Sequence, residues 1–386
     1  MAHILILGGG FGGLAAASEL RGQLDERDEI TLIARDDRFY MGFAKLWDLA
    51  DMRPLEGGSA PLADLERAGV RFVRTEVTGI DPVGLRVNTA DGTLTGDGLV
   101  VALGAVPSSS HRDLLRGDSA HDLYDAAQLP AMKRDLDAIE EGRVLVAILG
   151  GPFKCPPAPY EAALLVDERL RRRGARHRVA LTVATPQPIT LPAAGPDASR
   201  YVADHLGERD IELRAEHAVE AVDADRRTVV FRNGAELDYA VLLGVPASAP
   251  PPVVTGSPLA GPSGWVEPDR GTLRTGYERV YAVGDCTMVP TAGGQLPKAG
   301  VFAAAQAQVA ARNLLADLGR GEAATYEGHG YCFLELPGRR VAYVEGDFYA
   351  DPPDVQLIPA DEEQFRRKQA FERERLAAWL GATASW

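Results

Sequence analysis

The stretch HILILGGGFGGLAAASEL, residues 3–20, decides the fold class of this chain. Its apolar start, residues 4–7, predicts a short buried strand, and the alanine-rich segment 14–20 predicts a helix. Between them lie the glycines of a GxGxxG turn, Gly8, Gly10 and Gly13. In such a turn the first glycine allows a tight bend, the second lets the backbone approach a pyrophosphate, and the third lets helix and strand pack closely. The stretch therefore predicts an α/β fold that begins with a Rossmann-like dinucleotide-binding unit.

The turn after the next predicted strand, residues 30–33, offers two side chains to the nucleotide end of a cofactor. The acid that binds a ribose normally ends this strand, but Ala34 occupies its place. Asp36 could reach a ribose hydroxyl instead, and Arg35 could stack on an adenine. Both residues are equally compatible with a solvated turn, so the sequence leaves the two interpretations open.

Two other strand ends are typical of an FAD-binding domain. Residues 98–107 form an apolar run that ends in a glycine-rich turn, where the first half of such a domain closes. Residues 280–286, VYAVGDC, predict a buried strand whose end carries a glycine for close approach and a carboxylate for a ribitol hydroxyl of FAD. The residues that these two ends assign to the cofactor are Ala102, Gly104, Gly284 and Asp285.

The helix predicted over residues 301–318 begins beside a further candidate, Lys298. A helix N-terminus aimed at the pyrimidine ring of the flavin would stabilise the anionic reduced form. Lys298 would add a positive point charge at the same place. The alternative is a solvated lysine at the start of the helix.

A second strand–turn–helix unit contains the segment GGPFKCPPAPYE, residues 150–161. An apolar strand over residues 144–149 precedes it, and a helix over residues 160–173 follows. Prolines remove backbone donors from this turn, and its bulk blocks the close approach of a phosphate. The turn therefore presents Cys155 rigidly instead of binding a pyrophosphate; the alternative is a stiff loop with an incidental cysteine.

The order of these units predicts two Rossmann-like domains and a small C-terminal unit. A polar, helical crossover is expected over residues 108–142, and a single strand over residues 70–77. The C-terminal unit is expected to contain two strands within residues 328–348, with Cys332 on the first, and a charged helix over residues 362–380 that docks on the protein. The predicted boundaries are 1–107 and 241–320 for the two parts of the FAD-binding domain, 108–240 for the second Rossmann-like domain and 321–386 for the C-terminal unit.

Composition limits the partners of this chain of 386 residues. Its net charge of −14 disfavours nucleic acid and anionic membrane as main partners. Neither a signal peptide nor an apolar run of membrane-spanning length is visible, so we expect a cytoplasmic protein with at most peripheral contact at the inner face of the membrane. The three cysteines lack zinc-site spacing and the histidines are scattered, so no metal is predicted.

Nearly the whole chain resembles the sulfide:quinone oxidoreductase and flavocytochrome c sulfide dehydrogenase group, flavoproteins with a glutathione-reductase-like fold. The most specific match is PFKCPPAPYE, residues 152–161, which is similar to that group's PFRCPPGPYE segment. The resemblance implies that Cys155 is the active-site cysteine, that Glu161 transfers protons and that Cys332 is the second redox cysteine. The implied activity is oxidation of sulfide or a related sulfur compound, with electrons passed through FAD to quinone or another acceptor. A homodimer is one of the oligomeric states that the sequence leaves open.

The chain departs from that group at several positions. A third cysteine, found in many members before the 152–161 segment, is missing, and FAD is therefore expected to be bound non-covalently. Leu191-Pro192 stand where a histidine is expected. The implied chemistry also requires a lowered Cys155 pKa, which we expect from Lys154 or a nearby helix N-terminus.

Two alternative functions stay open beside the thiol-active flavoenzyme. The first is an NAD(P)H-dependent flavin reductase, which is disfavoured because the second domain has no GxGxxG turn. The second is a flavin-binding protein without turnover.

Overall fold

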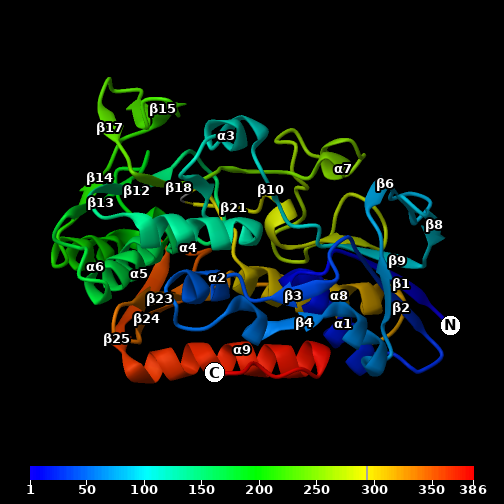
Figure 1. Ribbon diagram of the computed structural model, residues 1–386. Helices are drawn as coiled ribbons and strands as arrows, with labels where there is room; N and C mark the ends of the chain where they lie inside the picture. Colours follow the sequence, from blue (N-terminus) through cyan, green and yellow to red (C-terminus); the bar gives the residue numbers. More distant parts are fainter. Residues whose placement is uncertain (293) are drawn as a thin grey trace.

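The computed structural model describes residues 1–292 and 294–386, which form two parallel five-stranded sheets and a smaller antiparallel sheet near the C-terminus (Figure 1). The predicted α/β class, with two Rossmann-like domains and a C-terminal strand-and-helix unit, is confirmed. Figure 1 shows the two parallel sheets at opposite ends of the molecule. Helix α9 (Glu362–Leu380) runs along one side, from the C-terminal sheet to the first domain.

The first parallel sheet has the strand order β20 (Val280–Ala282), β9 (Gly98–Val101), β1 (His3–Leu7), β2 (Glu29–Ala34) and β5 (Arg71–Arg74). One face of β1, with Ile4 and Ile6, joins the core formed with α1 (Phe11–Gln23) and α8 (Gly300–Asp317). The other face, with Leu5 and Leu7, joins a second core. Strands covered on both faces are continuous apolar runs, which is why the sequence identified β1 and β9.

The second parallel sheet has the strand order β11 (Ala120–Asp122), β18 (Val241–Val245), β12 (Gly142–Ile148), β13 (Val179–Ala184) and β14 (Ile211–Arg214). The predicted boundary after residue 240 is therefore wrong, because β18 lies between β11 and β12 in this sheet. The chain returns to the first domain only after β18. The helices of this domain are α3 (Ser109–Leu114), α4 (Leu129–Ala138), α5 (Ala158–Arg172) and α6 (Gly195–Gly207).

Two segments differ from their predicted secondary structure. The crossover over residues 108–142 contains β11, whose polar residues are buried because His121 bonds to Asp135 at 2.7 Å. The single strand predicted over residues 70–77 is two strands in different sheets, β5 and β6 (Val77–Asp81). Short elements complete both domains: β3 (Arg38–Tyr40), α2 (Ala44–Leu49), β4 (Ser59–Pro61), β7 (Arg86–Thr89), β8 (Gly92–Thr95), β10 (Val106–Pro107), β15 (Val219–Asp223), β16 (Thr228–Phe231), β17 (Glu236–Asp238), β19 (Ser248–Ala249), α7 (Pro252–Thr255), β21 (Pro290–Thr291) and β22 (Gly294–Gln295).

The C-terminal sheet has three antiparallel strands, β23 (His329–Leu336), β24 (Arg340–Asp347) and β25 (Asp354–Asp361), instead of the two predicted. The sequence did not indicate β25 because it is an edge strand whose residues are mostly exposed and include a proline. Among the described residues, no helix is long and apolar enough to cross a membrane.

Helix α9 docks on the protein as predicted, and its inner face carries charges as well as apolar residues. The buried residues of the helix are Phe365, Lys368, Glu372, Leu376, Trp379 and Leu380. The Glu372 carboxylate accepts two hydrogen bonds from the Arg53 guanidinium, at 2.5 and 2.7 Å, and both side chains are at most 4% exposed. The Arg53 guanidinium also lies over the rings of Trp47 and Trp386.

Replacing Glu372 by alanine is expected to lower the free energy of unfolding by about 3–5 kcal/mol, because Arg53 would remain buried without its partner. Glu374→Ala changes an exposed carboxylate of the same helix and is expected to cost less than about 1 kcal/mol. Denaturant unfolding of the two variants measures the difference. Equal stability of the two variants would contradict a structural role for the Arg53–Glu372 pair.

Candidate active site

One large cavity, of about 1270 Å³, lies where the two domains and the C-terminal unit meet. It exceeds the ~300–1,000 Å³ of ordinary ligand pockets. Its wall includes the glycine turn after β1, the Cys155 turn, β23 and α9. The residues that the sequence assigned to a cofactor and those assigned to thiol chemistry therefore face the same space.

The glycine turn after β1 has the backbone geometry that the sequence predicts. Gly8 has φ +113°, and a Cβ at this position would lie 2.2 Å from the Ala102 carbonyl oxygen. A Cβ on Gly13 would lie 1.8 Å from the Gly8 carbonyl oxygen, so helix and strand approach too closely for any side chain. Gly10 lines the cavity and has open space at its Cβ position. The backbone at Gly10 is therefore free to meet a phosphate.

Asp285 fits the hydroxyl-binding role that the sequence assigns to it. The residue lines the cavity, and its Oδ1 is buried without a hydrogen-bond partner among the residues that the structure describes. Burial raises the pKa of this carboxyl group. Gly284 (φ +72°) and Gly104 (φ +68°) adopt left-handed conformations beside the cavity. An unpartnered buried acceptor in this position fits a hydroxyl donor of the FAD ribitol chain.

Arg35 and Asp36 lie at the far end of the same cavity. Their side chains are 66% and 76% exposed, and the closest approach between the guanidinium and the carboxylate is 3.7 Å. This exposed position is open to the nucleotide end of a cofactor, and the two predicted roles stay predictions.

Lys298 is buried and hydrogen-bonded by the protein itself, so it is not the solvated lysine that was the alternative, and its role as a point charge beside the flavin stays a prediction. Its Nζ donates to the carbonyl oxygens of Asp285 and Thr287, both at 2.9 Å, and lies 3.6 Å from the centre of the Trp265 ring. Burial lowers the pKa of the ammonium group. Lys298 also accepts the Cys155 N–H at its carbonyl oxygen, at 2.8 Å. The residue therefore joins the Asp285 turn to the Cys155 turn.

The Cys155 turn is held in a strained conformation by its neighbours. Cys155 has φ +49°, a left-handed conformation that is uncommon for cysteine. The Tyr124 hydroxyl donates to the carbonyl oxygens of Lys154 at 2.6 Å and Cys155 at 3.3 Å. The sequence did not indicate Tyr124, because only the fold brings the end of β11 to this turn.

The predicted lowering of the Cys155 pKa is wrong. Burial and the Glu161 charge raise the pKa of this thiol to about 12, and they outweigh the Lys368 charge, the Ala158 N–H at the start of helix α5 and the Lys45 charge, which act in the opposite direction. The Ala158 N–H bonds to the Cys155 carbonyl oxygen, and the Tyr160 N–H bonds to that of Pro157. The prolines of this turn have no N–H to offer.

Cys332 on β23 lines the same cavity as Cys155, and both thiols are free. Burial is the main cause that raises the pKa of the Cys332 thiol, and the charge of Cys155 is the next. The third cysteine, Cys286, is completely buried in the core.

Glu161 belongs to a buried cluster of charges beside the cysteines. Its Oε1 accepts the Glu335 N–H at 2.6 Å and faces the Lys368 Nζ at 3.4 Å. Lys368 donates to Glu335 Oε2 at 2.6 Å, and the Trp47 Nε1–H donates to the same oxygen at 2.8 Å. Burial alone would lower the pKa of Lys368, but the two carboxylates outweigh it and raise that pKa. The sequence missed Lys368 and Glu335, since both lie in segments that carry no motif.

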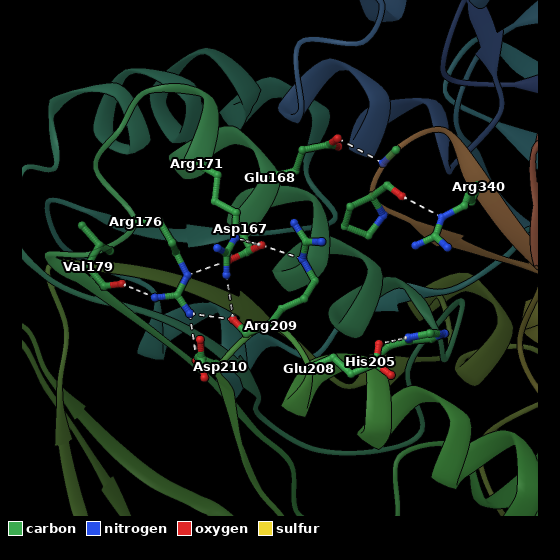
Figure 2. Close-up of polar contacts among 12 residues, drawn as sticks. Asp167, Glu168, Arg171, Arg176, Val179, His205, Glu208, Arg209, Asp210 and Arg340 are labelled. Carbon is green, nitrogen blue, oxygen red and sulfur yellow. Dashed lines mark hydrogen bonds and ion pairs between the residues drawn. The ribbon is translucent and has the colours of Figure 1, made fainter.

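A second hydrogen bond joins helix α5 to the end of the β23 segment, two helical turns beyond Glu161 (Figure 2). The Glu168 carboxylate accepts the Gly338 N–H in the β23–β24 turn, at 3.0 Å. The neighbouring residue Asp167 points to the other side and bonds to three guanidinium groups. Those groups belong to Arg171, Arg176 and Arg209. Glu161 and Glu168 therefore fix the helix that follows Cys155 against the strand that carries Cys332.

Fold and cavity together define a flavin-dependent oxidoreductase with two dinucleotide-binding domains. Residues 2–312 match the family described as pyridine nucleotide-disulphide oxidoreductase, and the chain belongs to that family. It is an FAD-dependent enzyme, and the resemblance to sulfide:quinone oxidoreductases that the sequence suggested is confirmed.

Three relatives show how far the likeness extends. The mitochondrial sulfide:quinone oxidoreductase of Mus musculus is 24% identical over 94% of this chain and 82% of its own length. The demethylphylloquinone reductase NdbB of Synechocystis is 30% identical over 82% of this chain and 80% of its own. The X-ray structure of the Aquifex aeolicus sulfide:quinone oxidoreductase superposes with a TM-score of 0.88 at 24% identity, covering 100% of this chain and 93% of that one.

Replacing Asp285 by alanine is expected to weaken FAD binding about tenfold to a hundredfold, because one charge-assisted hydrogen bond contributes ~1.5–3 kcal/mol. Fluorescence titration of the apoprotein with FAD measures this change. Asp225→Ala removes an exposed carboxylate elsewhere and serves as the control. An unchanged FAD affinity in Asp285→Ala would contradict the assigned role.

Glu168→Ala is expected to slow diamide-driven cross-linking of Cys155 to Cys332 several-fold, because the β23–β24 turn loses its hydrogen bond to α5. Glu168→Gln keeps an oxygen acceptor for the Gly338 N–H and should cross-link at nearly the original rate. Mass spectrometry of the joined peptides measures both rates. Equal rates in the two variants would show that Glu168 does not set the spacing of the cysteines.

Proposed function

We propose that this enzyme oxidises sulfide, or a closely related sulfur compound, at a Cys155/Cys332 pair beside non-covalently bound FAD. The observation that carries the proposal is that Cys155, Cys332 and Glu161 line the same cavity as Asp285 and the glycine turn. No cysteine occurs between Ala2 and Lys154, so the first flavin-binding segment offers no thiol for a covalent link to FAD.

The chemistry of the pair follows from thiol–disulfide exchange. A hydrosulfide anion attacks a Cys155–Cys332 disulfide, one sulfur–sulfur bond forms and one breaks, and the products are a cysteine persulfide and a cysteine thiolate. Bound FAD would accept two electrons as the persulfide and the thiolate, with loss of a proton, join through the added sulfur into a Cys155–Cys332 trisulfide. A second hydrosulfide or a thiol would then remove that sulfur as a persulfide and restore the disulfide. The neutral state that burial favours for both thiols means that each thiol must release a proton before it can act as a nucleophile.

Glu161 is the group that handles this proton in the proposed reaction. Its carboxylate lines the cavity, and its charge acts on both thiols. Lys368 lies on its other side and keeps the carboxylate paired within a buried region. A carboxylate held in this way can accept a proton from a thiol and return it without leaving an isolated charge.

A quinone is the acceptor that we propose for the electrons. The relatives named above are a sulfide:quinone oxidoreductase and a demethylphylloquinone reductase, so their names support a quinone as the oxidant. Peripheral contact with the inner face of a membrane would bring the enzyme to such an acceptor, whereas a homodimer remains a prediction.

The second domain disfavours NAD(P)H as the electron donor. The Gly150 backbone is covered by an imidazole, since a Cβ on this residue would lie 2.4 Å from the His111 ring. His111 is fixed there by the Ala247 N–H, which donates to Nδ1 at 3.0 Å. Together with the prolines of the Cys155 turn, this ring at the Gly150 backbone supports a turn that does not bind a pyrophosphate.

Anaerobic titration of the FAD-loaded protein with sulfide is the test of this function. We expect the visible absorbance of the flavin to bleach at stoichiometric sulfide in the wild type, and not in Cys155→Ser or Cys332→Ser. Cys286→Ser changes the buried core cysteine and should bleach like the wild type.

Two results would overturn the proposal. A wild-type protein that holds FAD but is not bleached by sulfide would remove sulfide as the substrate. Bleaching by NADH under the same conditions would assign the enzyme to the reductases instead.

A further inference from the structure

Lysine is rare in this chain and is concentrated at the cavity. The sequence contains five lysines against 36 arginines. Four of the five lysines line the cavity, namely Lys45, Lys154, Lys298 and Lys368. Arginine remains charged everywhere and is bulky, whereas the lysine ammonium is compact and changes its pKa readily when buried. The fifth, Lys133, lies outside the cavity and forms ion pairs with Asp48 and Asp51 at 2.6 and 2.9 Å.

Two of the four cavity lysines are already occupied by the protein. Lys298 donates to two backbone carbonyl oxygens, and Lys368 is paired with Glu335 and Glu161. Neither ammonium group is available to a ligand without breaking these contacts.

The other two lysines have fewer partners among the described residues, although the Lys45 Nζ also lies 5.6 Å from the centre of the Tyr124 ring. The Lys45 Nζ donates to the Tyr124 carbonyl oxygen at 2.5 Å, and the Lys154 ammonium forms no hydrogen bond with any described residue. Within the described part of the chain, no carboxylate oxygen lies within ion-pair distance, 4.0 Å, of either nitrogen. The charged groups that act on Lys45 are Lys154, Asp122, Cys155 and Asp125.

Both lysines belong to the Cys155 end of the cavity. The charge of Lys45 acts on the Cys155 thiol. Lys154 directly precedes Cys155, and its charge acts on Lys45 and on the carboxyl groups of Asp122 and Asp285. Tyr124 forms a hydrogen bond with each of the two lysine residues. Its carbonyl oxygen accepts from the Lys45 Nζ, and its hydroxyl donates to the Lys154 carbonyl oxygen. Both ammonium groups lie at the cavity wall, so these side chains are a local source of positive charge for an anion.

We propose that Lys45 and Lys154 form an anion subsite that binds the sulfur substrate in its anionic form beside Cys155. Two like charges on the same cavity wall repel one another, and an anion between them offsets that repulsion. The ligand class is a small sulfur anion such as hydrosulfide or a persulfide. The inference rests on the proposed function only for the identity of this natural ligand.

The pKa of Lys45 gives the subsite a pH dependence. Burial, followed by the charge of Lys154, lowers this pKa to about 8, while Asp122, Cys155 and Asp125 act in the opposite direction. The ammonium group is therefore mostly charged at neutral pH, and it loses its proton as the pH rises through about 8. Attraction for an anion is expected at neutral pH and is expected to weaken as the pH rises through this value.

Alkylation of Cys155 with two reagents tests the subsite in the FAD-loaded, pre-reduced protein. Iodoacetate is an anion and iodoacetamide is neutral, but both transfer a carbon to sulfur and release iodide. The measured quantity is the ratio of the two rate constants at Cys155, divided by the same ratio for a free thiol, with labelled peptides quantified by mass spectrometry.

We expect this ratio to fall about fivefold in Lys45→Met and in Lys154→Met at neutral pH. Lys45→Arg keeps the charge and should keep most of the preference, and Lys133→Met is the matched control that should leave it unchanged. Lys45→Gln is the second variant should Lys45→Met fail to hold FAD.

Three outcomes would overturn the subsite. An unchanged ratio in both lysine variants would remove the anion preference. Equal slowing by both reagents would mean that the lysines act only on the thiol, and a matching fall in Lys133→Met would mean that overall charge is responsible. The ratio does not depend on turnover, so a failure of sulfide oxidation leaves this test intact, and a failure here leaves the sulfide titration intact.

Discussion

The structure of the site depends on the contact between α5 and β23. The two cysteines lie 177 positions apart in sequence and belong to different units of the chain. They share one cavity because two α5 carboxylates accept backbone N–H groups of Glu335 and Gly338. A carboxylate can accept these bonds in a dry interface only if its charge is balanced, and Lys368 balances that of Glu161.

Burial raises the pKa of acidic groups on both sides of this contact. The same desolvation that keeps both thiols neutral also raises the pKa of Asp285 and of Glu335. Each of these groups lies within reach of a lysine charge, and the chain uses lysine here although it uses arginine almost everywhere else. Acidic groups and ammonium groups thus alternate around the cavity, which keeps its total charge small while leaving individual groups able to exchange protons.

Sequence reasoning succeeded where function depends on local backbone geometry. Gly8 and Gly13 are required by contacts shorter than any Cβ allows, and such requirements appear in the sequence as fixed glycine spacing. The Cys155 turn could be recognised because its prolines also restrict the local backbone. Tyr124, Lys45 and Glu335 could not be found this way, because their importance comes from neighbours that are distant in sequence. Strands β11 and β25 were missed because polar or exposed residues break the apolar pattern.

The imidazole of His111 against Gly150 also bears on how such an enzyme can change during evolution. A lineage that replaced the prolines of the Cys155 turn by glycines would still find the approach to Gly150 covered by a ring from α3. It would lose the rigid presentation of its thiol before it gained a place for a nicotinamide cofactor. Opening this turn to a dinucleotide therefore requires changes in two segments that are distant in sequence, the Cys155 turn and α3.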